Sequence, residues 1–439
     1  MDQNSFQIRC QRKHFLKDKH YHLLIDDNRI QISQSVNFQQ SKYILDLTFQ
    51  NLVFWKTEQN QLIAFGIKYN KVLKWFHAEK NNLEALYREL HTRIFFGNIS
   101  AIYESKEMLG SGASCKVYKV VNKITHYEFA SKCIRKDYIY KRDDKERYNR
   151  LLQEIELMRL IEHDSIVKMV DIYEGDKSYY IIMELLKGET LYQFIKKTQL
   201  NIFQIKAVMI RCLKALSYLN FLNIIHRDLK LENLVLLESN NVETVKIIDF
   251  GLAIPLSTPH RQLCGTPGYI APEMFIDKYP YTTKVDMFSL GAIFYKLLSR
   301  RSLFSGNNSD EILENNKRFK CNNHLKSCSN EILDLLKQML QKDPNKRISP
   351  EQALLHPFFE ESIQGDLGVA DESPHEIVRT FPHIKPMQIT NSNDNIAEIK
   401  IQVIRGSQPS FEQSLGSNYF PSFDEINKKS RNGSDHIIE

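Results

Sequence analysis

Two carboxylates and one amide stand in segments that place them in loops beside short apolar runs. Asp228 and Asn233 belong to Ile-Ile-His-Arg-Asp-Leu-Lys-Leu-Glu-Asn, which begins at Ile224, and Asp249 belongs to Ile-Ile-Asp-Phe-Gly, which begins at Ile247. A carboxylate can accept the proton of a hydroxyl group, and Mg²⁺ prefers carboxylate and amide oxygens as ligands. The three side chains therefore offer a proton acceptor and oxygen ligands of the kind that Mg²⁺ takes.

These segments resemble the catalytic loop and the metal-binding loop of protein kinases. The resemblance implies that Asp228 accepts the hydroxyl proton of a protein substrate and that Lys230 neutralises the transferred phosphoryl group. It also implies that Asn233 and Asp249 bind Mg²⁺ and that ATP is the phosphoryl donor. Lys230, together with Thr266 in Gly-Thr-Pro-Gly-Tyr, is typical of serine/threonine kinases and not of tyrosine kinases.

A glycine-containing stretch upstream fits the same family pattern. Gly110 and Gly112 indicate a tight turn between two strands, where the backbone can approach nucleotide phosphates. Cys115 stands where the family usually has a third glycine, so this stretch alone would also fit an ordinary hairpin. The apolar strand ending at Glu184 resembles the hinge that contacts adenine. The resemblance implies that ATP is bound by Leu109, Gly110, Gly112, Val117, Ala130, Lys132, Met183, Glu184, Leu186 and Val235.

A lysine and a glutamate complete the pattern. Lys132 lies on the next predicted strand, and Glu154 lies at the start of the apolar stripe of a predicted helix. Each alone is usually a solvated side chain, so their order and spacing carry the interpretation. The resemblance implies that Lys132 faces the α- and β-phosphates and pairs with Glu154, which adds both to Asp228, Lys230 and Thr266 as candidate catalytic residues.

The region before these motifs has a different pattern. Short alternating apolar runs from about Phe6 to Ile94 predict antiparallel strands, and the spacing of Leu83, Leu86 and Leu90 predicts an amphipathic helix after them. This order resembles a pleckstrin-homology domain. We therefore expect an α+β protein with a two-lobed protein kinase fold, in which a β-rich small lobe and a helical large lobe follow a small antiparallel β-barrel capped by a C-terminal helix.

The length of 439 residues and the 42% hydrophobic content allow two or three domains. We expect a pleckstrin-homology-like domain over residues 1–98, a kinase domain over residues 103–359 and a disordered tail over residues 360–439. No stretch reads as a membrane span or a signal peptide, which predicts a cytoplasmic protein. Seven scattered cysteines predict reduced thiols, and the formal charge of +6 does not support nucleic-acid binding.

Basic side chains gather near the start of the chain. Arg12, Lys13, Lys17 and Lys19 resemble the cluster by which some pleckstrin-homology domains bind phosphoinositides, a contact that would recruit the chain to membranes. The alternative is a solvated face beside a hairpin. The N-terminal domain could also fold back on the kinase domain as an inhibitory module, and the sequence leaves these readings open.

Some positions depart from the kinase pattern. Gln262 stands four residues before Thr266, where many related kinases carry a phosphorylated threonine that pairs with the arginine equivalent to Arg227. We therefore expect activity without phosphorylation at that site. Thr190 and Lys296 stand where kinases directed to basic peptides have acidic side chains, so strong selection for arginine is not expected.

The resemblance is greatest to the calcium/calmodulin-dependent kinase group, judged from residues 297–319 and from the ending His-Pro-Phe-Phe at Phe359. Residues 361–390 are nevertheless acidic and interrupted by prolines, whereas calmodulin targets are basic amphipathic helices. Direct calmodulin binding is therefore not expected. The alternative to an active kinase is a pseudokinase scaffold that binds nucleotide without turnover, and the presence of every catalytic and metal-binding residue type argues against it.

Overall fold

The structure is a computed structural model that describes residues 6–15, 17–26, 28–112, 115–141, 145–259, 262–276, 281–322, 324–325 and 328–360. These residues form two compact units. The first unit contains the residues up to Ile155 together with Lys168–Leu185, and the second contains Glu156–Val167 and the residues from Leu186 onward. Of the predicted tail, residues 361–439 lie outside the described part of the chain.

Seven strands open the first unit, in the sheet order β4-β3-β2-β1-β7-β6-β5. Each pair of neighbours in this order is antiparallel. Their side chains alternate between core and solvent, as in β1, where Ile8 and Cys10 are buried and Gln7 and Arg9 are exposed. The strands are β1 (Phe6–Arg12), β2 (Lys19–Ile25), β3 (Arg29–Ser33), β4 (Tyr43–Asp46), β5 (Leu52–Glu58), β6 (Gln61–Tyr69) and β7 (Val72–His77).

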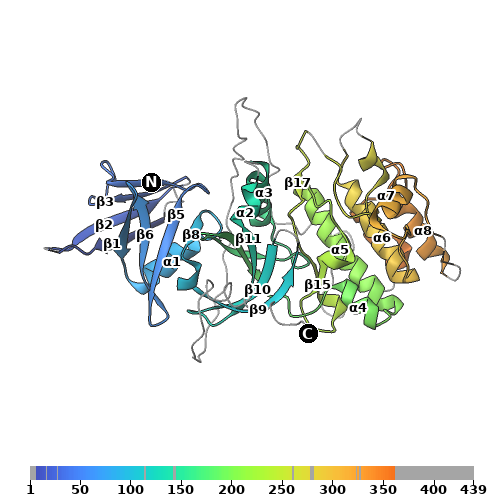
Figure 1. Ribbon diagram of the computed structural model, residues 1–439, viewed down its shortest axis with the longest axis horizontal. Helices are drawn as coiled ribbons and strands as arrows, with labels where there is room; N and C mark the ends of the chain where they lie inside the picture. The colour runs from blue at the N-terminus through green and yellow to red at the C-terminus, as the bar shows by residue number, and fades with distance from the viewer. Residues whose placement is uncertain are drawn as a thin grey trace, which may run out of the picture. The chain divides into compact units, whose positions relative to one another are not determined.

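Helix α1 (Lys80–Leu90) follows these strands and lies beside β6 (Figure 1). Leu83, Leu86 and Leu90 are buried, so the predicted amphipathic stripe forms the inner face of this helix. The helix ends before Ile94, although the side chain of Ile94 is also buried. The β-rich start and the capping helix agree with the expected fold class.

The sheet continues beyond β5 through β8 (Phe95–Gly97), a short strand that lies parallel to both β5 and β12. A side chain at Gly97 would be blocked, because an added Cβ would lie 2.2 Å from Cε1 of Phe54. With β8 and the strands β9 to β13, which follow it in the sequence, this sheet of the first unit has thirteen strands. The remaining elements of this unit are η1 (Ile99–Ala101), β9 (Tyr103–Ser111), β10 (Cys115–Asn122), β11 (Glu128–Arg135), α2 (Lys136–Ile139), β12 (Met169–Glu174), β13 (Ser178–Glu184) and the part of α3 (Lys145–Leu160) up to Ile155.

A buried polar cluster connects α1 with the later strands of this sheet. The hydroxyls of Tyr87 and Tyr103 donate hydrogen bonds of 2.5 and 2.6 Å to Oδ2 of Asp171 on β12. The hydroxyls of Tyr87 and Tyr173 lie 2.9 Å apart. Trp55 on β5 packs against Tyr87 with 5.0 Å between ring centroids, so residues from both ends of the unit share one core.

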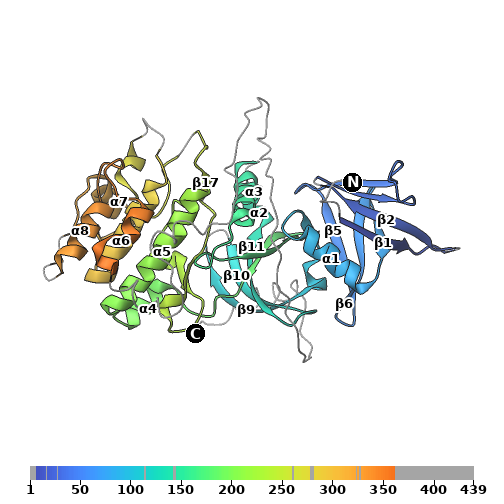
Figure 2. The ribbon, with the colours of Figure 1, turned by 180° about the vertical axis from the view of Figure 1, so that it is seen from behind.

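The second unit is mainly helical, with α5 as its longest helix (Figure 2). Asn201 caps α5 through a reciprocal capping box with Gln204, and Ser349 forms the same motif with Gln352 at the start of α9. The helices are α4 (Leu191–Lys197), α5 (Ile202–Phe221), α6 (Lys284–Ser299), α7 (Ser309–Lys317), α8 (Asn330–Met339) and α9 (Pro350–Leu354), with η3 (Leu231–Asn233), η4 (Val242–Thr244), η5 (Pro272–Phe275) and η6 (Pro357–Phe359). The strands are β14 (Ile224–Ile225), β15 (Leu234–Leu236), β16 (Val245–Ile247) and β17 (Ile254–Pro255).

A buried ion pair joins two segments of this unit that are far apart in the sequence. Arg347, 1% exposed, donates from both terminal nitrogens to the carboxylate of Glu273, at 2.5 and 2.8 Å.

All seven cysteines are described and are free thiols. In the described part of the chain, no helix combines the length and apolar character that crossing a membrane requires.

Candidate active site

The loop that carries Asp228 is anchored by a buried carboxylate in the second unit. Asp286, in the first turn of α6, accepts hydrogen bonds from the backbone amides of His226 and Arg227 at 2.8 and 2.9 Å. Burial raises the pKa of Asp286, while the charge of His226 and the two amide hydrogen bonds oppose the rise. The loop thus has a fixed backbone just before Asp228.

Asp228 lies between two of the predicted site residues. Its Oδ1 accepts a hydrogen bond from the hydroxyl of Thr266 at 2.6 Å, and its Oδ2 lies 2.7 Å from Nζ of Lys230. Nζ of Lys230 also donates to the Thr266 hydroxyl at 2.8 Å. A carboxylate and an ammonium group are therefore held side by side, as transfer of a phosphoryl group to a hydroxyl requires.

Asn233 and Asp249 lie at the same end of a two-stranded ribbon. Asn233 precedes β15 and Asp249 follows β16, whose residues Leu234 and Ile247 are paired. The backbone amide of Ile248 donates to the carbonyl of Asn233 at 2.9 Å, which fixes the two loops against each other. The position of both side chains thus follows from strand register.

The side chains of this ribbon fit a magnesium ion. Nδ2 of Asn233 donates to the backbone carbonyl and to Oδ2 of Asp228, at 2.8 and 3.2 Å, so the other amide atom, Oδ1, can act as a metal ligand. Asp249 has a positive φ of 65° and accepts a long bond of 3.4 Å from the amide of Gly251 through Oδ1. One amide oxygen and one carboxylate form the hard oxygen set that Mg²⁺ takes.

The predicted ion pair of the first unit is present. Nζ of Lys132 on β11 lies 2.6 Å from Oε1 of Glu154 on α3. The side chain of Lys132 is 12% exposed and that of Glu154 is 6% exposed, so the pair is largely desolvated. Strand pairing places Lys132 opposite Val117 on β10 and opposite Ile181 on β13, in the middle of the sheet.

The glycine-containing turn joins β9 to β10. The amide of Gly112 donates to the carbonyl of Cys115 at 2.8 Å, which closes the turn although Cys115 replaces a glycine. A Cβ added at Gly110 would meet no atom within 4 Å, so this part of the strand borders open space. Val117 on β10 pairs with Gly110, so the two residues assigned to ATP lie side by side.

The residues assigned to adenine are divided between the two units. In the first unit Ala130 on β11 is paired with Met183 on β13, and Glu184 follows Met183. Leu186 and Val235 belong to the second unit, where Val235 forms an isolated bridge with Thr190. Each unit therefore holds part of the predicted ATP-binding set.

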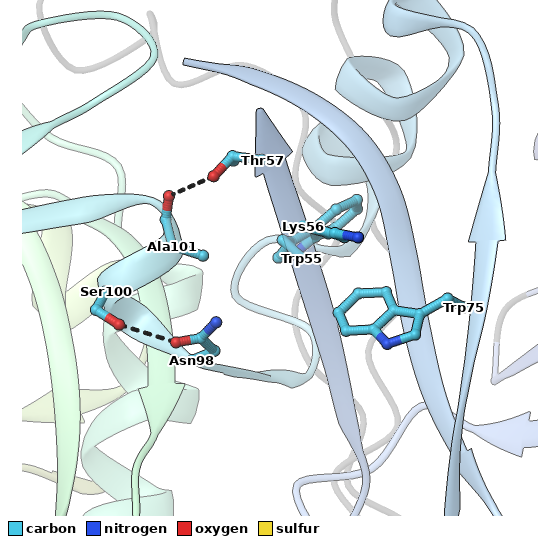
Figure 3. Close-up of a pocket in the computed structure, with 7 residues that line it drawn as sticks. All are labelled: Trp55, Lys56, Thr57, Trp75, Asn98, Ser100 and Ala101. Carbon is cyan, nitrogen blue, oxygen red and sulfur yellow. Dashed lines mark hydrogen bonds between the residues drawn. The ribbon is translucent and has the colours of Figure 1, made fainter. Parts of the chain in front are cut away.

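A separate pocket of about 360 Å³ lies in the first unit (Figure 3). Trp75, Lys56 and Asn98 are among the residues that line it, and a hydrogen bond of 3.1 Å from Thr57 to the carbonyl of Ala101 borders it. The other lining residues are Trp55 and Ser100. No residue predicted for catalysis or ATP binding contributes to this pocket.

Tyr281 is a site residue that sequence analysis missed. Its hydroxyl accepts a hydrogen bond of 3.0 Å from Arg227, the residue before Asp228. It stands five positions before Asp286, in a stretch without a clear apolar period. The one signal in the sequence is a large aromatic residue shortly before α6.

Comparisons with known proteins agree with this geometry. A family model described as "Protein kinase domain" matches residues 103–359. The chain is 33% identical over 273 residues to calcium-dependent protein kinase 3 of Plasmodium yoelii yoelii, a match that covers 60% of this chain and 49% of the relative. The same kinase of Plasmodium berghei (strain Anka) is 34% identical over 273 residues, with 60% and 48% covered. "Probable serine/threonine-protein kinase 2" of Plasmodium falciparum (isolate K1 / Thailand) is 38% identical over 211 residues, with 47% and 41% covered. The chain thus spans about half or less of the length of these relatives.

Proposed function

The chain belongs to the protein kinase family, and from this premise we propose that it transfers the γ-phosphate of ATP to serine and threonine hydroxyls of protein substrates. The observation that carries the proposal is the arrangement around Asp228, which lies 2.6 Å from the Thr266 hydroxyl and 2.7 Å from the Lys230 ammonium group. This carboxylate can orient a substrate hydroxyl and accept its proton, and Lys230 can offset the charge of the phosphoryl group.

The other predicted residues have supporting roles in this proposal. Magnesium ions held by Asn233 and Asp249 would supply positive charge next to the phosphates. Glu154 fixes the ammonium group of Lys132 at 2.6 Å, so that Lys132 presents its charge from a defined position. Because Gln262 cannot accept a phosphate, we expect the enzyme to be active without phosphorylation at that position.

The activity is tested with the purified full chain, after phosphatase treatment, on a mixed serine/threonine peptide library with ATP and Mg²⁺. Asp228→Asn and Asp249→Asn serve as blanks, because each keeps the shape of the side chain and removes its charge. Phosphate transfer above the blanks supports the proposal. Nucleotide binding by the unmodified chain with no transfer would instead support the pseudokinase alternative.

Substrate selection is a further part of the proposal. Glu189 is paired with Lys197 at 2.6 Å, so its charge is already partly neutralised. Glu232, four positions after Asp228, is half-buried and adds another carboxylate to the loop that follows the proposed proton acceptor. We therefore propose a moderate preference for basic peptides. A positional peptide library with one dominant arginine position would contradict it.

For the N-terminal strands we propose a contact with anionic membranes. The loop between β1 and β2 carries Lys13 and Lys17, both exposed, and Lys19 begins β2. Phe15, in the same loop, is fully exposed, at 103%. Arg12 donates to the hydroxyl of Tyr43 at 2.8 Å, which fixes its guanidinium group beside the start of β4. An exposed aromatic ring among lysines suits an interface of lipid and water.

The membrane contact is tested with the full chain on vesicles that contain phosphoinositides. Lys13→Glu combined with Lys17→Glu should weaken binding more than tenfold, since each basic residue near an anionic surface contributes about 1 kcal/mol. Lys317→Glu with Lys320→Glu is the matched control, because these exposed lysines belong to the second unit. Equal losses in both variants, or no binding to any vesicle, would contradict the contact. We propose a cytoplasmic enzyme that this contact recruits to membranes.

A further inference from the structure

Arg227 is held at its backbone and at its guanidinium group. Its backbone has a φ of 70°, in the left-handed region, and Asp286 fixes its amide at 2.9 Å. Nε donates to the carbonyl of Leu252 at 2.6 Å, and Nη1 donates to the hydroxyl of Tyr281 at 3.0 Å. The guanidinium group therefore connects the catalytic loop to two other segments of the second unit.

The hydroxyl of Tyr281 extends this connection to the segment before Thr266. It donates to the carbonyl of Gln262 at 3.1 Å while it accepts from Arg227. Tyr281 is 5% exposed, so its end of both hydrogen bonds is buried. Burial is the main cause that raises the pKa of Tyr281, which keeps the hydroxyl protonated and able to donate.

Leu252 and Gln262 border the stretch between the metal-binding loop and Thr266. The carbonyl of Arg227 also lies against Gly265, where φ is +100° and an added Cβ would be 2.7 Å from that oxygen. The chain from Leu252 to Thr266 is thus tied to Arg227 near both ends. Thr266 in turn donates to Asp228, so a shift of Gln262 would be passed to the proposed proton acceptor.

We propose that Tyr281 is a positioning residue for phosphoryl transfer, which holds the segment from Leu252 to Thr266 on Arg227 through its hydroxyl in the place of a phosphate. The inference rests on the proposed kinase activity. It explains how a chain with glutamine at position 262 can order this segment. The guanidinium group of Arg227 already has a carbonyl and a neutral phenol as acceptors in part-buried hydrogen bonds, so no phosphorylated side chain is needed.

The test removes only the hydroxyl, with Tyr281→Phe in the phosphatase-treated full chain. We expect kcat to fall about tenfold, the value of one hydrogen bond to a charged group, with unchanged affinity for the nucleotide. In an Arg227→Ala background the same change should alter kcat less than about twofold, because both variants remove the same contact. Tyr295→Phe is the matched control, since Tyr295 is buried and, within the described residues, its hydroxyl has one hydrogen bond, accepted from the amide of His324.

Hydrogen exchange provides a second readout that does not depend on activity. Peptides that cover residues 252–266 should exchange faster in Tyr281→Phe than in the unmodified chain or in Tyr295→Phe. Unchanged exchange, or equal kcat losses in the two tyrosine variants, would overturn the inference. If the unmodified chain transfers no phosphate while exchange still responds to Tyr281→Phe, the proposed function fails and the structural connection stands.

Discussion

From the buried carboxyl of Asp171 we predict that the stability of the first unit depends on pH. This carboxyl is 1% exposed, and burial raises its pKa from an ordinary value of 3.8 to about 7, although hydrogen bonds from Tyr103 and Tyr87 lower it. Its Oδ1 has no hydrogen-bond partner within the described residues. The folded unit therefore favours the protonated carboxyl, which is neutral and can donate a hydrogen bond of its own.

The size of the effect follows from the two pKa values. A folded-state pKa above the unfolded one means that the stabilisation is fully present below about pH 4 and is lost as pH rises through about 7. The whole step amounts to about 4 kcal/mol of unfolding free energy. Between about pH 5.5 and pH 8 the loss is about 2 kcal/mol, because part of the step already lies below that range.

The perturbation is Asp171→Asn, which keeps the shape of the side chain and does not titrate. Other groups also change stability with pH, so the informative quantity is the difference in unfolding free energy between the unmodified chain and the variant. That difference should move by about 2 kcal/mol in favour of the variant from about pH 5.5 to pH 8. Asp176→Asn, at an exposed position of the β12–β13 turn, is the control.

Urea unfolding followed by tryptophan fluorescence is the suitable assay. The chain has only two tryptophans, Trp55 and Trp75, and both belong to the first unit. Trp55 packs against Tyr87, so it reports on the core that contains Asp171. A difference between variant and unmodified chain that stays constant over this pH range would refute a raised pKa at Asp171. A matching change in the Asp176→Asn control would assign the effect to the surface.

Three further predictions concern the ion pairs of Arg347 and Lys132 and the hydroxyl of Thr266. Arg347→Met should destabilise the second unit by about 3–5 kcal/mol, since it leaves the carboxylate of Glu273 without its partner, and thermal unfolding followed by circular dichroism measures this. Lys132→Met should lower kcat/KM for ATP at least about a hundredfold in steady-state assays, whereas Lys119→Met, at a pair on β10 of the same sheet, should leave it nearly unchanged. Thr266→Val should lower kcat about tenfold and Thr266→Ser should restore it, because the hydroxyl of residue 266 bonds to Asp228, the proposed proton acceptor.

The loops of Asn233 and Asp249 could be placed side by side from sequence because their geometry is local. Asn233 and Asp249 each lie within two residues of a short strand, and pairing of Leu234 with Ile247 brings them to one end. Lys132 and Glu154 are farther apart, yet their order along one strand and one helix was sufficient to predict the ion pair that is observed. The fold class and the resemblance to serine/threonine kinases are likewise confirmed.

Other features depend on contacts that no local pattern marks. Tyr281 reaches Arg227 across 54 positions, and neither neighbourhood carries a period that would associate them. Strand β8 is too short for an alternating pattern, and it forms because its backbone fills the gap between β5 and β12. Asp171 had a visible signal, because it is an acid between the apolar residues Val170 and Ile172 of β12, but its partners lie 84 and 68 positions away.

Because the N-terminal strands form one sheet with the strands that follow them, their removal would also disturb the rest of that sheet. Cutting before Ile99 would take away β5 and β8, which leaves an edge of β12 without its neighbour. It would also remove Tyr87 from Asp171 and so leave one hydrogen bond to a buried carboxyl. A truncated kinase could then lose activity through instability alone, or gain it only if relief of inhibition outweighs that loss. Point variants in the β1–β2 loop keep this core intact, and they therefore separate targeting from folding where a deletion does not.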